Sequence, residues 1–169
     1  ALQMQGKTHR SMALLDSVAH LRGEYDPTTL TALQVQLGVL GLVATDELSK
    51  AVAELADSPW PDDHLALGFY SIAHADTTKL RTETNSLRAF AGGRKHKGDF
   101  SRACLETGAA VLEETQAFLQ HRSPRRGLET VAEELHGCGI LEYLSLLQLR
   151  YFALEQSIHG GAVGETERL

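Results

Sequence analysis

The segment "HLALGFYSIAHADTTKLRTETNSLRAFAGG", residues 64–93, decides the fold. Its first twelve residues are apolar on nearly every side, which is typical of a helix buried at the centre of a protein. Asp76 can then cap a second helix by accepting one of its first free backbone amides. That helix carries one apolar face, made of Leu80, Leu87, Phe90 and Ala91. The glycines at 92 and 93 end it, so the segment predicts two helices joined by a short turn.

The rest of the chain repeats this pattern of apolar stripes between helix start and stop signals. Further helices are expected over residues 9–22, 26–42, 45–58, 100–120, 123–137 and 139–158. Asp26, Thr45, Asp99 and Ser123 are the expected caps at four of their starts. Leu and Ala supply 47 residues whereas Val and Ile supply 11, which favours helices over strands. The sequence therefore predicts an all-α protein of about eight helices, with antiparallel pairs forming a bundle or a short α-hairpin array.

The length of 169 residues fits one domain, and residues 1–169 are expected to form a single helical domain. A sub-boundary is expected at 57–63, because Pro59 and Pro61 in "SPWPDD" cannot both lie inside a helix. Residues 159–169 are glycine-rich and are expected to fray.

Composition and cysteine spacing bear on location. Hydrophobic residues make up 43% of the chain and charged residues 22%, as in a compact globular domain. Residues 1–10 lack the apolar core of a signal peptide, and no uncharged apolar run of about 18 residues occurs, so no membrane association is expected. Cys104 and Cys138 lack CxxC spacing and indicate neither a disulfide framework nor a structural zinc site. We therefore expect a reducing compartment and a cytoplasmic protein.

Charge is distributed unevenly along the chain. Residues 79–126 hold ten Lys and Arg against five Asp and Glu, residues 1–78 hold four against ten, and residues 127–169 hold two against seven. Such asymmetry can mark a surface for an acidic partner. It can equally reflect attraction between regions of one fold.

The basic loop "GGRKHKGDF", residues 92–100, has the spacing of half a phosphate-binding loop, from Gly93 to Gly98. The full motif needs Lys and then Ser or Thr after the second glycine, whereas Asp99 and Phe100 stand there. Asp99 is also placed to cap the next helix and to repel phosphate. The loop is therefore interpreted as a bend between two helices.

A resemblance to a known family covers residues 84–115, about a fifth of the chain. With Gly98-Asp99-Phe100 as the turn, the small and apolar positions that match are Leu87, Phe90, Ala91, Ala103 and Ala110. This segment resembles a single tetratricopeptide repeat, a family that stacks antiparallel helix pairs into concave surfaces that bind peptides. The match departs from the family pattern at Gly92 and Gly93, which lie inside the first helix, and at Arg94, which replaces an aromatic residue.

The candidate partner-binding residues are the cations of two basic clusters. They are Arg94, Lys95 and Lys97 in the first, and Arg122, Arg125 and Arg126 in the second. A helix between them would separate the clusters by roughly 33 Å at about 1.5 Å per residue, so they should not form one compact patch. With few interleaved aromatics and an acidic overall charge, nucleic acid is not the expected partner.

Metal or acid–base chemistry would require convergent His and Glu side chains. "EELH" at 133–136 contains the only ExxH pair, Glu133 and His136, whereas a di-iron bundle needs two such pairs. His64 and His74 flank an otherwise apolar helix, where a hydrogen-bonded histidine is more common than a ligand. No cofactor or metal is expected, and any metal site would involve Glu133, His136, His64 and His74.

These observations favour a non-enzymatic helical module that binds a protein or peptide, with a regulatory or assembly role. It would bind through a groove or through its basic middle segment. The alternative is a small helical enzyme or ligand- or metal-binding bundle that uses core His and Glu residues. Self-association is a further alternative, because several helices are apolar beyond one stripe. The two main hypotheses differ in what they require: an exposed groove for the first, and an enclosed pocket with His and Glu for the second.

Overall fold

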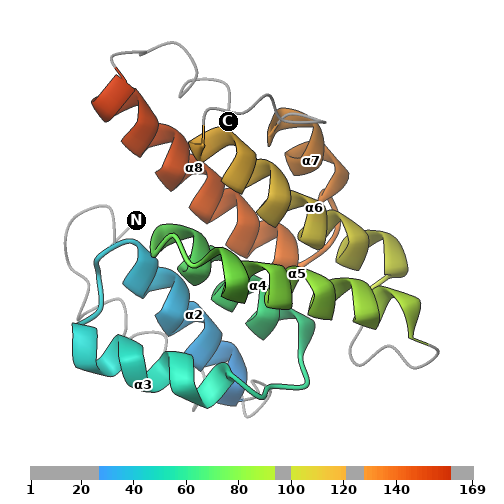
Figure 1. The fold of residues 1–169 in the computed structure, drawn as a ribbon. Helices are drawn as coiled ribbons and strands as arrows, with labels where there is room; N and C mark the ends of the chain where they lie inside the picture. The colour runs from blue at the N-terminus through green and yellow to red at the C-terminus, as the bar shows by residue number, and fades with distance from the viewer. Residues whose placement is uncertain (1–26, 94–99, 121–127, 161–169) are drawn as a thin grey trace.

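The computed structural model describes residues 27–93, 100–120 and 128–160, and these form seven helices and no strand (Figure 1). The helices are α2 (Pro27–Val39), α3 (Thr45–Leu55), α4 (Pro61–Ala73), α5 (Thr77–Gly92), α6 (Arg102–Leu119), α7 (Leu128–Glu134) and α8 (Ile140–Gly160). The predicted all-α class is confirmed for this part of the chain. The helix expected over 9–22 lies outside the described residues, as do the caps expected at Asp26 and Ser123.

Helix α4 is the centre of the fold, as its apolar sequence predicts. It packs against α2, α3, α5, α6 and α8. Its residues Leu65, Ala66, Leu67 and Phe69 are completely buried. Figure 1 shows α2 and α3 on one side of the α4–α5 pair and α6, α7 and α8 on the other, an arrangement compatible with a helical bundle.

Two groups of buried side chains form the core on the two sides of α4. The larger group joins α4 to α5, α6, α7 and α8, and the smaller one joins α4 to α2 and α3. Tyr70 packs against both groups. Gly68 allows the close approach of α6, because a Cβ at this position would overlap the side chain of Leu112.

Two helix ends are formed by the residue types that usually end or begin a helix. Helix α2 ends in a Schellman motif, in which the amide of Leu42 donates to the carbonyl of Leu37 at 2.9 Å. Gly41 supplies the left-handed residue of that motif, with φ of 69°. Asp76 caps α5 as predicted, and its carboxylate accepts from the amide of Lys79 at 2.9 Å.

Two predicted caps are wrong. Helix α3 begins at Thr45 with Ala44 as its N-cap and no capping side chain, so Thr45 lies one position too late to act as the cap. Helix α6 begins at Arg102, and its cap is Ser101, whose hydroxyl accepts from the amide of Cys104 at 3.1 Å. Ser101 is therefore the residue that meets the free amides of α6, in place of Asp99.

The cysteines form a disulfide, which contradicts the prediction drawn from their spacing. Cys104 on α6 is bonded to Cys138 in the turn before α8, with their Cα atoms 5.6 Å apart. Cys138 is buried between Gly137 and Gly139, whose φ angles of 84° and 61° shape the turn. The cysteines are 34 positions apart in the sequence, so no local motif indicates that they pair. The cysteines thus no longer support a reducing compartment, and the cytoplasmic location stays a prediction.

Within the described ranges, no helix combines the length and the apolar character needed to cross a membrane.

Candidate functional site

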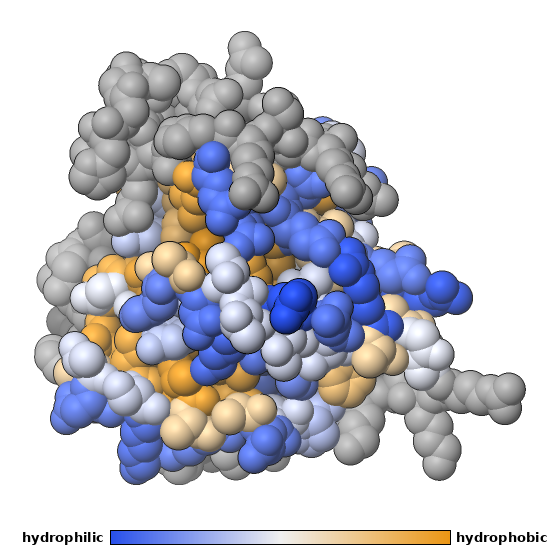
Figure 2. All heavy atoms as spheres, viewed as in Figure 1, coloured by the Kyte–Doolittle hydropathy of each residue, from blue (hydrophilic) through white to orange (hydrophobic). Residues whose placement is uncertain are grey.

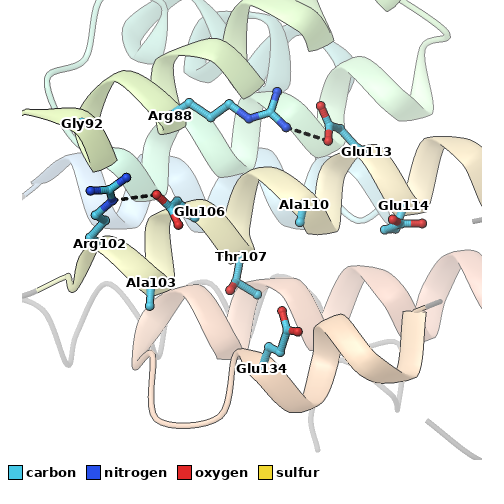
Figure 3. Close-up of a pocket in the computed structure, with 10 residues that line it drawn as sticks. All are labelled: Arg88, Gly92, Arg102, Ala103, Glu106, Thr107, Ala110, Glu113, Glu114 and Glu134. Atoms are coloured by element: carbon cyan, nitrogen blue, oxygen red, sulfur yellow. Dashed lines mark hydrogen bonds and ion pairs between the residues drawn. The ribbon is translucent and has the colours of Figure 1, made fainter. Parts of the chain in front are cut away.

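A hollow lies along the seam between α5 and α6 (Figure 3). These two helices pack side by side and run in opposite directions. The hollow has a volume of about 760 Å³. Its lining comes from α5, α6 and α7: Arg88, Gly92, Arg102, Ala103, Glu106, Thr107, Ala110, Glu113, Glu114 and Glu134. Figure 2 shows that hydrophilic residues predominate over the middle of this face, where α5 lies in Figure 1.

An ion pair bridges the two helices across the hollow. A guanidinium nitrogen of Arg88 on α5 donates to Glu113 Oε2 on α6 at 2.8 Å. The two side chains are 51% and 48% exposed, so solvent screens their attraction. The pair therefore positions the side chains without locking the two helices together.

A second ion pair lies at the start of α6. Arg102 Nε donates to Glu106 Oε1 at 2.7 Å, one helical turn further along. This hydrogen bond and the charge of Glu106 raise the pKa of Arg102 above its ordinary value. Both side chains are more than half exposed, so this pair too can exchange partners at small cost.

The other wall of the hollow is formed where α6 faces α7. Figure 3 shows Thr107 of α6 and Glu134 of α7 pointing toward one another. Glu114, further along α6, is almost fully buried, whereas Glu134 is exposed. The disulfide joins this part of α6 to the turn that follows α7, so the wall is held covalently.

A second hollow of about 510 Å³ continues along the same seam. Arg88 and Glu113 line both hollows. The remaining lining of the second hollow is polar apart from one leucine: Thr77, Thr78, Leu80, Arg81, Thr84, Asn85 and Gln116. We call the two hollows together the α5–α6 groove, with the Arg88–Glu113 pair at its middle.

The predicted partner-binding cations cannot be placed in this geometry. Arg94, Lys95 and Lys97, like Arg122, Arg125 and Arg126, lie outside the described residues. Their role as a binding surface stays a prediction.

Of the four predicted metal candidates, His64 has the most defined surroundings. It lies at the start of α4 and is almost fully buried. Its Nδ1 lies 2.7 Å from Glu83 Oε2 on α5, and its Nε2 lies 3.0 Å from the backbone oxygen of Ser58. His64 thus ties α4 to α5 and to the preceding loop.

The other three candidates lie on exposed positions. His74 stacks on Tyr70 with ring centroids 4.1 Å apart, and its Nδ1 lies 2.9 Å from the backbone oxygen of Tyr70. His136 Nδ1 lies 3.2 Å from Glu142 Oε1, and Glu133 is exposed on α7. Among the described residues, no group of three or more His, Cys, Asp and Glu side chains is arranged to hold a metal ion.

Glu142 stabilises the turn that precedes α8. Its Oε2 accepts from the backbone amide of Gly137 at 2.9 Å. This hydrogen bond, followed by the contact with His136, lowers the pKa of Glu142 below its ordinary value. The carboxylate therefore favours the folded turn when it is ionised.

The sequence predicted a groove but neither its location between α5 and α6 nor its lining residues. The i,i+4 spacing of Arg102 and Glu106 is a signal visible in the sequence. Arg88 and Glu113 are 25 residues apart, so only the packing of α5 on α6 brings them together.

Comparison with known proteins found no match to this chain among protein-family models, curated proteins or solved structures.

Proposed function

We propose that this chain is a helical interaction module that binds an extended segment of a protein partner in the α5–α6 groove. The observation that carries the proposal is that the two hollows lie along one helix seam and share Arg88 and Glu113 in their lining. A site of this shape suits a peptide that lies along two helices. A regulatory or assembly role is the class of function that we infer from it.

The charge of the groove favours a basic partner segment. Four carboxylates and two guanidinium groups line the larger hollow, and the second hollow adds the guanidinium of Arg81, so carboxylates outnumber guanidinium groups by one over the whole groove. Complementary charge speeds association and selects partners more than it adds affinity. We therefore infer a partner segment with more Lys and Arg than Asp and Glu, bound in a salt-sensitive way.

The ion pairs within the groove support this proposal because they are cheap to open. Exposed ion pairs contribute about 0–1 kcal/mol, so a partner's side chain can take the place of Arg88 or Arg102 beside its glutamate. We also propose that the α5–α6 pair is the hairpin that resembles a tetratricopeptide repeat. That family likewise binds peptides on surfaces made by helix pairs.

The test is a peptide selection followed by a charge-neutralising double substitution. Peptides would first be selected from a random library for binding to the wild-type chain. Their affinities for the wild type and for the double variant Glu106→Gln/Glu113→Gln would then be measured by fluorescence anisotropy. The matched control is Glu47→Gln/Glu54→Gln, which removes the same charge from exposed positions of α3. We expect the selected peptides to be basic. Their affinity for the groove variant should fall about tenfold, or about 1.4 kcal/mol, and their affinity for the control variant should equal that for the wild type.

Two results would count against the proposal. One is a selection that yields peptides with no excess of basic residues. The other is an equal loss of affinity on both double variants, since a general charge effect would then explain the binding.

The alternative function, a small helical enzyme or ligand-binding bundle, draws on one observation, the buried contact between His64 and Glu83. Native mass spectrometry of the purified chain separates the two proposals. A stoichiometric metal or small molecule retained without a protein partner would replace the interaction module with this alternative.

A further inference from the structure

Three polar side chains on α2 and α8 are completely buried. They are Gln36 on α2 and Ser145 and Gln148 on α8. Gln148 Nε2 donates to the backbone oxygen of Gln36 at 2.9 Å, which joins the two helices. Ser145 lies one turn before Gln148 on the same face of α8. Gln36 shares a face with Leu33 and Val39, which pack in the core group that includes α8.

Four atoms of this cluster have no hydrogen-bond partner within the described part of the chain. They are both amide atoms of Gln36, the hydroxyl oxygen of Ser145 and Oε1 of Gln148. Each would make hydrogen bonds to water in the unfolded chain and would forfeit them on burial. Buried polar groups almost always have a hydrogen-bond partner. Four such atoms in one cluster therefore indicate that a further hydrogen-bonding group is bound here.

Other buried hydroxyl groups in the same fold show how such a group is usually satisfied. Ser71, Thr84 and Thr115 each donate to the backbone oxygen four residues earlier, at 2.7, 2.9 and 2.7 Å. Ser145 is as buried as these residues and makes no such bond. The Ser145 hydroxyl therefore lacks the bond within its own helix that satisfies these other residues.

The chemistry of the cluster defines that partner. Gln36 offers both a donor and an acceptor, Ser145 a hydroxyl that can do either, and Gln148 an acceptor. None of the three carries a charge, so the cluster offers nothing to balance a buried ion. Because all three are completely buried, the partner is small. We propose that Gln36, Ser145 and Gln148 bind internal water between α2 and α8, at a site separate from the α5–α6 groove.

This water adds to the direct bond from Gln148 to Gln36 by satisfying the four remaining polar atoms of the cluster. Buried water of this kind makes two to four hydrogen bonds and is costly to remove. Its exchange with solvent requires α2 to separate from α8. The residence time of the water therefore reports how often that contact opens.

The test measures bound water and stability on the same variants. Water-selective NMR on the labelled chain would record transfer from water to the side-chain amide protons of Gln36 and Gln148. We expect long-lived transfer in the wild type and its loss in Gln36→Met, which keeps the side-chain length and removes both polar atoms. Ser145→Ala is paired with Ser71→Ala, because both delete a buried serine hydroxyl but only Ser71 has a backbone acceptor.

We expect Ser145→Ala and Ser71→Ala both to lower the melting temperature, because each deletes a hydroxyl that has a partner. Ser145→Ala should also weaken the water signal, which Ser71→Ala should leave intact. A higher melting temperature for Ser145→Ala would overturn the proposal, since it would mean that the hydroxyl has no partner in the folded protein. Absence of long-lived water at Gln36 and Gln148 in the wild type would overturn it as well.

Discussion

Reduction of the Cys104–Cys138 disulfide should cost this fold a large part of its stability. The bond closes a ring with a sequence separation of 34 residues. Loss of that constraint on the unfolded chain corresponds to about 4 kcal/mol in the chain-entropy treatment. Domains of this size are stable by about 5–15 kcal/mol, so the oxidised and reduced proteins should be easy to tell apart.

The assay is urea unfolding of the oxidised and the reduced wild type, followed by circular dichroism. Reduction breaks the S–S bond and removes no side chain. The difference in unfolding free energy between the oxidised and reduced proteins therefore measures the effect of the cross-link. The midpoint should fall, and the slope with urea should rise because the reduced unfolded chain is more expanded. The variant Cys104→Ala/Cys138→Ala is the control, and reductant should leave its unfolding unchanged. A difference below about 1 kcal/mol between oxidised and reduced wild type would refute the reasoning, because chain entropy would then not govern the effect.

Two further predictions concern single positions. Gly68→Ala should destabilise the fold by up to about 2 kcal/mol in thermal melts, because the new methyl group overlaps buried Leu112 and the cost of repacking exceeds the gain in helix propensity. Gly92→Ala is the control. Its new methyl group meets no atom within 4 Å, so it should be neutral or stabilising in the same melts. Because the pKa of Glu142 is lowered in the folded state, its stabilising effect is present above the unfolded pKa of about 4.3 and is lost as pH falls through the lower folded value. The difference in unfolding free energy between wild type and Glu142→Gln should therefore shrink from pH 7 to pH 3, and a difference that grows on acidification would contradict the hydrogen bond to Gly137.

Local signals in the sequence were enough to predict much of the fold. The apolar surround of α4, the cap at Asp76 and the glycines at 92 and 93 all act within a few residues of the structure they determine. Helix periodicity and capping depend on neighbours three or four positions away. The structure confirms helix α4, the cap at Asp76 and the end of α5 because each depends only on nearby residues.

The side-chain pairs that the sequence did not reveal depend on contacts between distant positions. Glu83 is 19 residues from His64, and Glu113 is 25 residues from Arg88. The cysteines are 34 residues apart, and Gln148 is 112 residues from Gln36. Neither residue type nor spacing predicts such a pair, because the packing of the helices determines which of their faces come into contact. The cap errors have a different cause: Asp99 and Ser101 are both good capping residues, and only the backbone determines which one precedes the first helical turn.

The disulfide also changes how the chain responds to a protease. Any single cut between residues 104 and 138 leaves two pieces that remain joined through sulfur. The sequence places Arg122, Arg125 and Arg126 inside this ring, and each is a trypsin site. A chain nicked once at one of them would migrate as an intact molecule on a denaturing gel until reductant is added, and would then separate into two fragments.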